Sequence, residues 1–281
     1  MCPVMPETSS SSLAPPKPRT YGAVNWLGLW TLYKREVGRF IKVWMQTLLA
    51  PVVSTLLFMT VFKLAFGNRG ELTGDFAGLD YNSFLAPGLI VMAMLQNAFQ
   101  NSSSSLTIAK VQGSQVDFLM PPLSPVELTI GFIFGAVTRG IMVGAIAAIG
   151  IHFSGLADLS IVHVWPILWF GLMATIFLAA IGAMGGIWAD KFDHLAAVSN
   201  FVIVPLTFLS GTFYDINVLV EPFKSLAYFD PIFFLIDGFR YGFLDAANSN
   251  VMTGMIVSAG SAFLASAGVW WMIKSGYKLK A

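Results

Sequence analysis

Ionisable residues are scarce in this sequence. Asp, Glu, Lys and Arg make up 11% of its 281 residues, whereas a soluble domain contains about 25%. The single cysteine, Cys2, excludes an intrachain disulfide and a cysteine-based metal site. The three histidines lie far apart, and the sequence contains no H-E-x-x-H motif and no phosphate-binding G-x-x-x-x-G-K-S/T motif. We therefore expect no catalytic residues, no metal site and no cofactor on this chain. No basic cluster resembles a nucleic-acid-binding patch, so nucleic acid is not an expected partner.

Hydrophobic residues are correspondingly abundant, at 56% of the chain, with a mean hydropathy of +0.72. Such a composition is typical of an integral membrane protein. Residues 1–24, which begin with a stretch rich in serine and proline, predict a disordered cytoplasmic tail without a cleavable signal peptide. Residues 25–281 are expected to form one transmembrane domain. Its six predicted spans, each near the ~20 residues that a bilayer requires, are residues 45–66, 84–108, 128–151, 161–188, 195–213 and 252–273.

An amphipathic helix is predicted before the first span, over residues 25–44. Tryptophan and other apolar residues recur on one face at helical spacing, and Arg35, Arg39 and Lys42 lie on the other. This pattern favours a helix that lies in the membrane interface. The alternative is a helix packed on its own protein.

The distribution of lysine and arginine predicts the orientation of the chain. With the N-terminus inside, most of these residues fall in inside segments, and most acidic residues fall outside. Both termini and the loop 110–127 are therefore expected in the cytoplasm. Residues 214–250 would lie outside, where two aromatic-rich stretches flank Pro231. They are typical of half-helices that re-enter the outer leaflet; the alternative is an ordinary extracellular helical hairpin.

The loop 110–127 is compact and rich in proline. Gly113 can end the helix of the second span, and Pro121 and Pro122 can end a short helix over residues 112–120. Such a helix would be a docking surface for a soluble partner, anchored by its apolar and aromatic side chains. The expected docking residues are Gln112, Gly113, Ser114, Gln115, Val116, Asp117, Phe118, Leu119 and Met120.

Two spans carry polar residues at membrane depth. Arg139 lies near the middle of the third span, where a cation must face protein or water, so polar groups of span two or four are expected beside it. It is either a pathway charge or a structural hydrogen-bond donor. In the second span, Asn97, Gln100, Asn101 and Ser104 share one helical face. That face would line either a helix contact or a cavity open to the cytoplasm.

Small residues recur at every fourth position in spans three, four and six, for example at Gly131 and Gly135. This spacing permits close helix packing, which we expect within the chain rather than across a dimer. In the fifth span, Asn200 and Pro205 suit a lipid-facing helix poorly, which makes Asn200 a further pathway candidate.

An aromatic set after the fifth span is expected to form an apolar gate near the outer leaflet. Its members are Phe229, Phe233, Phe234 and Phe239. An apolar exit suits an amphipathic substrate, such as a lipid, a lipid-linked glycan or a hydrophobic drug, better than a hydrated ion.

Three segments resemble a known family. They are FLAPGLIVMAMLQNAFQNSSSSL in the second span, VQGSQVDFLMPPLSPVELTIGFIFGAVTRG in the loop and third span, and FLSGTFYDI at the end of the fifth. Together they resemble the permease subunit of ABC-2 type (type V) ABC transporters, and within it the branch of nodulation-type lipo-oligosaccharide exporters. The basic residue before the glycine of the loop is often arginine in this family, whereas here it is Lys110, three residues before Gly113. The sequence also has no large extracellular domain.

The resemblance implies an all-α fold of six transmembrane helices, with an N-terminal interfacial helix and re-entrant extracellular half-helices. It also implies a homodimer in the bacterial inner membrane. Because spans two and five suit lipid poorly, we expect its pathway to be formed mainly by spans one, two and five and to be closed on the outside by residues 214–244. Each copy would dock one ATP-binding subunit, so that two such subunits bind ATP and Mg²⁺. The expected function is an ATP-driven exporter permease for an amphipathic substrate. The alternative is a secondary transporter or channel that needs no ATPase.

Overall fold

The computed structural model describes residues 22, 24–66 and 76–279, so the predicted tail lies almost entirely outside the described residues. Six helical segments are long and apolar enough to cross a membrane, and the predicted all-α membrane fold is confirmed. The elements are α1 (Trp26–Ile41), η1 (Met45–Leu49), α2 (Ala50–Phe66), α3 (Tyr81–Val111), α4 (Val116–Leu119), α5 (Pro125–Ser154), α6 (Val164–Trp188), α7 (Phe192–Val198), η4 (Ser199–Ile203), α8 (Val204–Leu209), η5 (Ile216–Val218), α9 (Phe223–Phe229), α10 (Pro231–Leu244) and α11 (Val251–Ser275).

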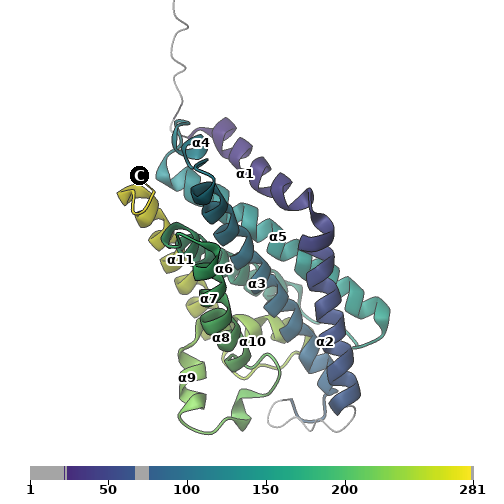
Figure 1. Cartoon of the computed structure of the whole chain (residues 1–281). Helices are drawn as coiled ribbons and strands as arrows, with labels where there is room; N and C mark the ends of the chain where they lie inside the picture. Colours follow the sequence, from purple (N-terminus) through teal and green to yellow (C-terminus); the bar gives the residue numbers. More distant parts are fainter. Residues whose placement is uncertain (1–21, 23, 67–75, 280–281) are drawn as a thin grey trace, which may run out of the picture.

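The helices form an elongated bundle with two distinct ends (Figure 1). The beginning of α1, the short helix α4 and the C-terminal end of α11 lie together at one end, which we call the α4 end. The helix α9 lies at the opposite end, which we call the α9 end, and α3 begins on that side. Helices α2 and α3 therefore run in opposite directions through the bundle.

Helix α3 is the centre of the bundle, with 89% of its apolar window buried inside the protein. Helices α5 and α6 approach it closely because they present glycines to its backbone. A Cβ atom at Gly140 of α5 would lie 3.0 Å from the Met94 carbonyl oxygen, and one at Gly186 of α6 would lie 2.7 Å from that of Ser103. The small residues at four-residue spacing in these two helices thus serve packing within the chain, as predicted.

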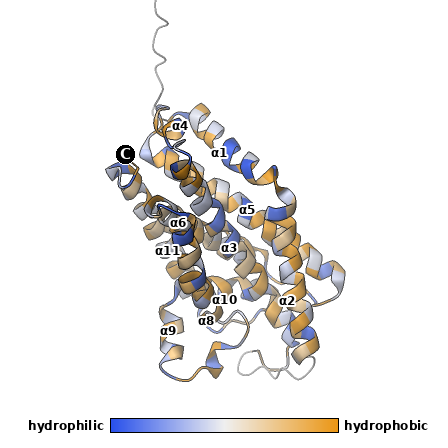
Figure 2. Ribbon diagram, in the orientation of Figure 1, coloured by the Kyte–Doolittle hydropathy of each residue, from blue (hydrophilic) through white to orange (hydrophobic). Residues whose placement is uncertain are grey.

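Helix α1 packs one face on α5. Leu32 and Glu36 are buried there, and a Cβ atom at Gly131 or Gly135 would collide with them. Apolar residues of α1 outside this contact, such as Trp26, are exposed. Figure 2 shows hydrophilic patches along α1 beside the mostly hydrophobic α2. The helix is therefore packed on its own protein along one face, and contact with the membrane interface stays a prediction for the other.

The fifth span is irregular. It comprises α7, the π-helical η4 and α8, and only 17% of its window is buried inside the protein. Pro205 follows the first residue of α8. Because proline has no N–H to donate and its ring displaces the preceding turn, a widened turn before it is the expected adjustment.

Two short helices, α9 and α10, follow the fifth span at the predicted positions. Pro231 begins α10, and the Asp230 carboxylate caps that helix by accepting a hydrogen bond of 2.9 Å from the Ile232 N–H. Proline suits the first turn of a helix, where its missing N–H would have no intrahelical partner. Re-entry of these helices into the outer leaflet stays a prediction.

Candidate functional site

The polar half of α3 lies mainly in a helix–helix contact. Its buried polar residues are Asn97, Asn101, Ser102, Ser103, Ser105 and Thr107. Glycines of α6 make this contact possible, because a Cβ atom at Gly182 or Gly186 would collide with Phe99, Ser102 or Ser103. The predicted face of Asn97, Gln100, Asn101 and Ser104 is divided between the two interpretations: Asn101 and Ser104 lie in a helix contact, whereas Asn97 and Gln100 line a cavity.

Two charged residues of α1 complete this contact. The Glu36 carboxylate is fully buried and accepts a hydrogen bond of 2.9 Å from the Ser105 hydroxyl. Arg39 donates to the Ser104 hydroxyl at 3.1 Å, and to the backbone and side-chain oxygens of Asn101 at 2.6 and 3.1 Å. The Arg39 guanidinium also lies 3.5 Å from Glu36. Arg39 therefore faces α3, which the amphipathic pattern of α1 does not predict.

Arg139 is buried between α5 and α3. Its guanidinium donates a hydrogen bond of 2.9 Å to the side-chain oxygen of Asn97, whose own amide donates to the Ala93 carbonyl oxygen. The prediction that Arg139 is buried against protein, with a polar group of span two beside it, is confirmed.

A cavity of about 260 Å³ opens beside this pair, between α2, α3 and α5. Of the predicted polar residues, Asn97, Gln100 and Arg139 line it; Asn101 and Ser104 instead bind Arg39. The full lining is Gln46, Ala50, Pro51, Ser54, Thr55, Phe58, Leu89, Met92, Ala93, Gln96, Asn97, Gln100 and Arg139. Asn200 does not join this site: it lies exposed in η4, and its role in the pathway stays a prediction.

The predicted docking helix is shorter than expected. Only Val116–Leu119 is helical, while residues 112–115 form a turn in which Gly113 has a left-handed φ of +69°. Gln112 and Gly113 are exposed, whereas Ser114 and Gln115 are half-buried. The expectation of one helix over residues 112–120 is therefore wrong at its start, since the chain must reverse sharply after α3.

Phe118 does not lie on the exposed surface. It is 4% exposed and packs edge-on against Phe132, with ring centres 5.3 Å apart, while the Arg35 guanidinium lies 5.9 Å from its ring. Its assignment as a docking anchor is wrong, because α4 turns its largest apolar side chain inward onto α5. The outer side of α4 keeps Val116, Asp117, Leu119 and Met120 exposed.

A cluster of charges holds the chain just before this loop. The Lys110 ammonium donates to the backbone oxygens of Ile187 and Ala189, at the end of α6, and lies 3.2 Å from the Asp190 carboxylate. Lys278 lies 2.9 Å from the other oxygen of Asp190. Hydrogen bonds from Lys278 and Lys110 hold the pKa of Asp190 below its ordinary value. The cluster fixes the last turn of α3 to the α6–α7 turn and to the segment after α11.

The four aromatic residues of the predicted gate do not form one cluster. Phe229 is 86% exposed, whereas Phe233 and Phe234 are buried against Ile216 and Ala227. Phe239 lies on another side of α10. It follows Phe234 by five residues, which is about 1.4 turns of an α-helix, so the two side chains point in different directions. The single aromatic gate is therefore wrong.

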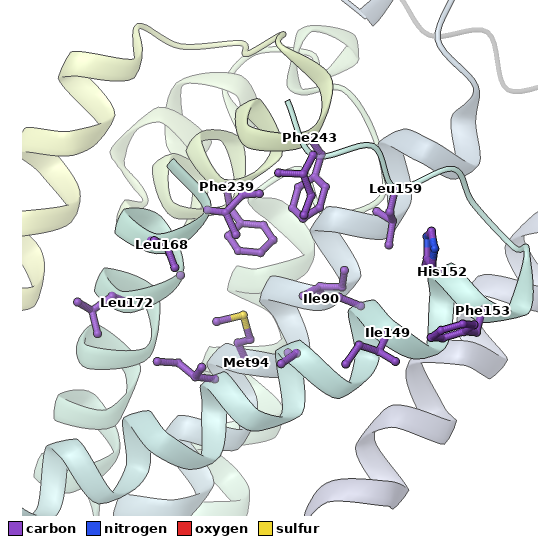
Figure 3. A pocket seen from close by; sticks show the side chains of 17 residues that line it. Ile90, Met94, Ile149, His152, Phe153, Leu159, Leu168, Leu172, Phe239 and Phe243 are labelled. Carbon is purple, nitrogen blue, oxygen red and sulfur yellow. The ribbon is translucent and has the colours of Figure 1, made fainter. Parts of the chain in front are cut away.

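Phe239 instead lines an apolar cavity of about 490 Å³ between α3, α5, α6 and α10. Figure 3 shows Phe239 and Phe243 on one side of it, with Ile149, His152 and Phe153 on α5 and Leu168 and Leu172 on α6. Within the described residues, no group of three or more His, Cys, Asp or Glu side chains could hold a metal ion.

Arg240 is a buried residue that was not among the predicted site residues. It donates to the backbone oxygens of Phe84, Gly211 and Thr212 at 3.2, 2.9 and 3.4 Å. It thereby joins α10 to the beginning of α3 and to the turn after α8. The sequence signal was a charged residue within an aromatic-rich segment, which shows that a partner is needed but not which one.

A model of the family described as ABC-2 type transporter matches residues 28–244. The chain belongs to this family. The inner membrane transport permease YadH of Escherichia coli (strain K12) is 34% identical, over 91% of this chain and 98% of the relative. Nodulation protein J of Rhizobium leguminosarum bv. viciae is 24% identical, over 82% of this chain and 86% of the relative.

The sequence resemblance is thus confirmed, and this ABC-2 permease is a multi-pass protein of the inner membrane. Membership of the family implies that an ABC ATP-binding subunit pairs with it. The chain itself contains no phosphate-binding G-x-x-x-x-G-K-S/T motif.

Proposed function

We propose that this ABC-2 permease is the membrane subunit of an ATP-driven exporter, which moves an amphipathic substrate out across the inner membrane. A separate ATP-binding subunit would supply the energy by docking at the α4 end. The observation that carries this proposal is the outer surface of α4. There, the apolar side chains of Val116, Leu119 and Met120 are exposed beside Asp117, and exposed apolar groups of this kind mark interaction sites.

The orientation of the chain supports docking at that end. Lysine and arginine gather at the α4 end, for example Lys34 and Arg35 on α1 and Lys274 on α11. Because positively charged segments remain in the cytoplasm, we propose that the α4 end is cytoplasmic. The α9 end would then face outward.

We further propose that two copies form the pathway along α2 and the fifth span. The apolar windows of these spans are only 22% and 17% buried inside the protein. The cavity lined by Arg139 lies between α2 and α3, so a second copy placed against α2 would enclose it further. The substrate would then meet polar groups within the membrane before it reaches the outer side.

The docking proposal can be tested by co-expressing the permease with its ATP-binding subunit and measuring their co-purification and ATP-driven transport. Met120→Asp and Leu119→Asp should weaken the complex, because each places a carboxylate in the apolar contact. Met252→Asp is the matched control, since Met252 is exposed at the beginning of α11, whose other end lies at the α4 end. Full transport without any ATP-binding subunit would contradict the proposal and favour a secondary transporter or channel.

A further inference from the structure

Arg139 is a buried cation that the described part of the chain does not neutralise. It is 7% exposed, and none of the salt bridges among the described residues includes it. Its one hydrogen-bond acceptor is the neutral amide of Asn97, and its Nε is buried without a partner. A charge at membrane depth is costly unless a partner compensates it, so such residues mark functional sites.

The surroundings add positive charge rather than removing it. A second arginine, Arg39, binds Asn101 of α3, one helical turn from the Asn97 that accepts from Arg139. Arg39 in turn lies 3.5 Å from Glu36, whose other oxygen accepts from Ser105. Together Arg39 and Arg139 carry two positive charges and Glu36 carries one negative charge, so one positive charge is left over in this group. Replacing Arg139 by an uncharged residue would balance these charges, so charge balance within the chain does not account for it.

The cavity beside Arg139 has a polar end and an apolar end. Gln46, at the beginning of the first span, and Gln100, in the later half of α3, lie toward the α4 end. Phe58 and Leu89 lie toward the α9 end, because α2 and α3 run in opposite directions. Gln46 also belongs to the π-helix Met45–Leu49, and π-helical turns occur frequently at functional sites.

We infer that this cavity binds the phosphate-class anionic group of an amphipathic molecule. The guanidinium of Arg139 would hold the anion, the glutamine amides would supply further donors, and the apolar chain would lie toward Phe58. Arginine suits this role because its planar group of donors matches phosphate oxygens and remains charged. The inference rests on the proposed function and narrows the substrate to anionic, lipid-like molecules.

A phosphate group could come from a lipid headgroup or from free phosphate. The apolar end of the cavity favours a phosphate that is attached to an acyl chain, because a free phosphate would leave Phe58 and Leu89 without a partner. The two sources can be separated by offering each of them to the same complex.

The test uses the complete complex of permease and ATP-binding subunit, reconstituted in phosphatidylcholine vesicles, with phosphatidic acid as the probe. The ATPase rate is measured as the phosphatidic acid content rises. The wild-type rate should rise, and Arg139→Gln should need roughly tenfold more phosphatidic acid for half-maximal stimulation. Arg139→Lys should lie in between, since it keeps the charge but not the planar fork. Inorganic phosphate should not stimulate.

Two further variants keep the test decisive. Asn97→Asp retains an acceptor for Arg139 but neutralises it from within the chain, and it should reduce the response as Arg139→Gln does. Lys191→Gln removes an exposed charge just before α7, an element that does not line the cavity, and should respond as wild type does.

The inference is overturned if Arg139→Gln and Asn97→Asp both respond as wild type does. It is equally overturned if phosphatidic acid leaves the wild-type rate unchanged, or if inorganic phosphate replaces it fully. Complex assembly and the basal ATPase rate in phosphatidylcholine alone test the proposed function, so a failure there is distinguishable.

Discussion

The guanidinium carbon of Arg240 lies 3.8 Å from the centre of the Phe84 ring at the beginning of α3. The same guanidinium donates to the backbone oxygens of Phe84 and Gly211. A cation over an aromatic face is favourable, and more so where water is excluded. One fully buried side chain thus connects α10, the central helix and the end of the fifth span.

We predict that Arg240→Leu destabilises the protein by about 2–4 kcal/mol, because buried acceptors lose a charged donor. Arg240→Lys should recover part of this loss, since lysine keeps the charge but lacks the planar set of N–H donors of arginine. Thermal unfolding in detergent measures both, with the exposed Lys42→Leu as the control. Equal stability of Arg240→Leu and wild type would contradict the structural role.

The second prediction concerns the packing of α1 against the glycines of α5. Gly135→Ala should destabilise by roughly 1–3 kcal/mol, because the added methyl group would collide with Glu36. Gly260→Ala is the matched control: it lies in α11 with nothing within 4 Å of the added Cβ. There, the change should stabilise slightly, since alanine favours a helix by up to about 1 kcal/mol over glycine. If both changes had the same sign, the packing argument would fail.

The third prediction is a dependence of stability on pH. Lys278 and Lys110 lower the pKa of Asp190 in the folded protein, so this group stabilises the fold above its unfolded pKa of about 3.9. That contribution is lost as the pH falls through the lower, folded value. Asp190→Asn should therefore have a lower Tm than wild type at neutral pH, and the difference should shrink in acid. A difference that stays constant with pH would contradict this account.

The fourth prediction separates stability from docking on α4. Phe118→Ala should lower the unfolding free energy by about 3 kcal/mol, as expected for removing a buried ring. Met120→Ala should change stability by less than about 0.5 kcal/mol, because Met120 is 79% exposed, and should instead weaken binding of the ATP-binding subunit. Unfolding curves and co-purification distinguish the two. Unchanged stability in Phe118→Ala would return that residue to the docking surface.

The fifth prediction concerns the proposed dimer. On a background with Cys2→Ser, single cysteines on the exposed face of Phe192–Leu209, such as Phe201→Cys, should crosslink two copies and block transport. Leu264→Cys, exposed on α11, should not. A disulfide needs Cα atoms within about 7 Å, so non-reducing gels report proximity. Efficient crosslinking only through α5 or α11 would rule out this arrangement.

Features encoded locally were predictable from the sequence. The spans follow from apolar length, and α9 and α10 follow from aromatic stretches broken at Pro231. The partner of Arg139 followed from the cost of burying a cation, which requires an acceptor on a neighbouring span, and Asn97 supplies it.

Features encoded across the chain were not predictable in the same way. Glu36 is buried because Gly131 and Gly135 have no side chain and let α1 pack closely on α5. The charge pattern of α1 alone would place its polar face outward. The partners of Arg240 are backbone oxygens up to 156 residues away, and backbone groups leave no side-chain signal. The four gate phenylalanines could not be assigned to sides of α10 before its neighbours were known.

The burial of α3 has a consequence for how this protein is made. The chain is synthesised from its N-terminus, so α3 enters the membrane before α5 and α6 exist. Its later half carries Asn97, Asn101 and a run of serines, against which α5, α6 and α1 pack in the finished structure. During biogenesis this half must be shielded by the insertion machinery until Gly182 and Gly186 of α6 arrive. A polar centre that serves the folded permease therefore makes its second span dependent on helices that are not yet translated.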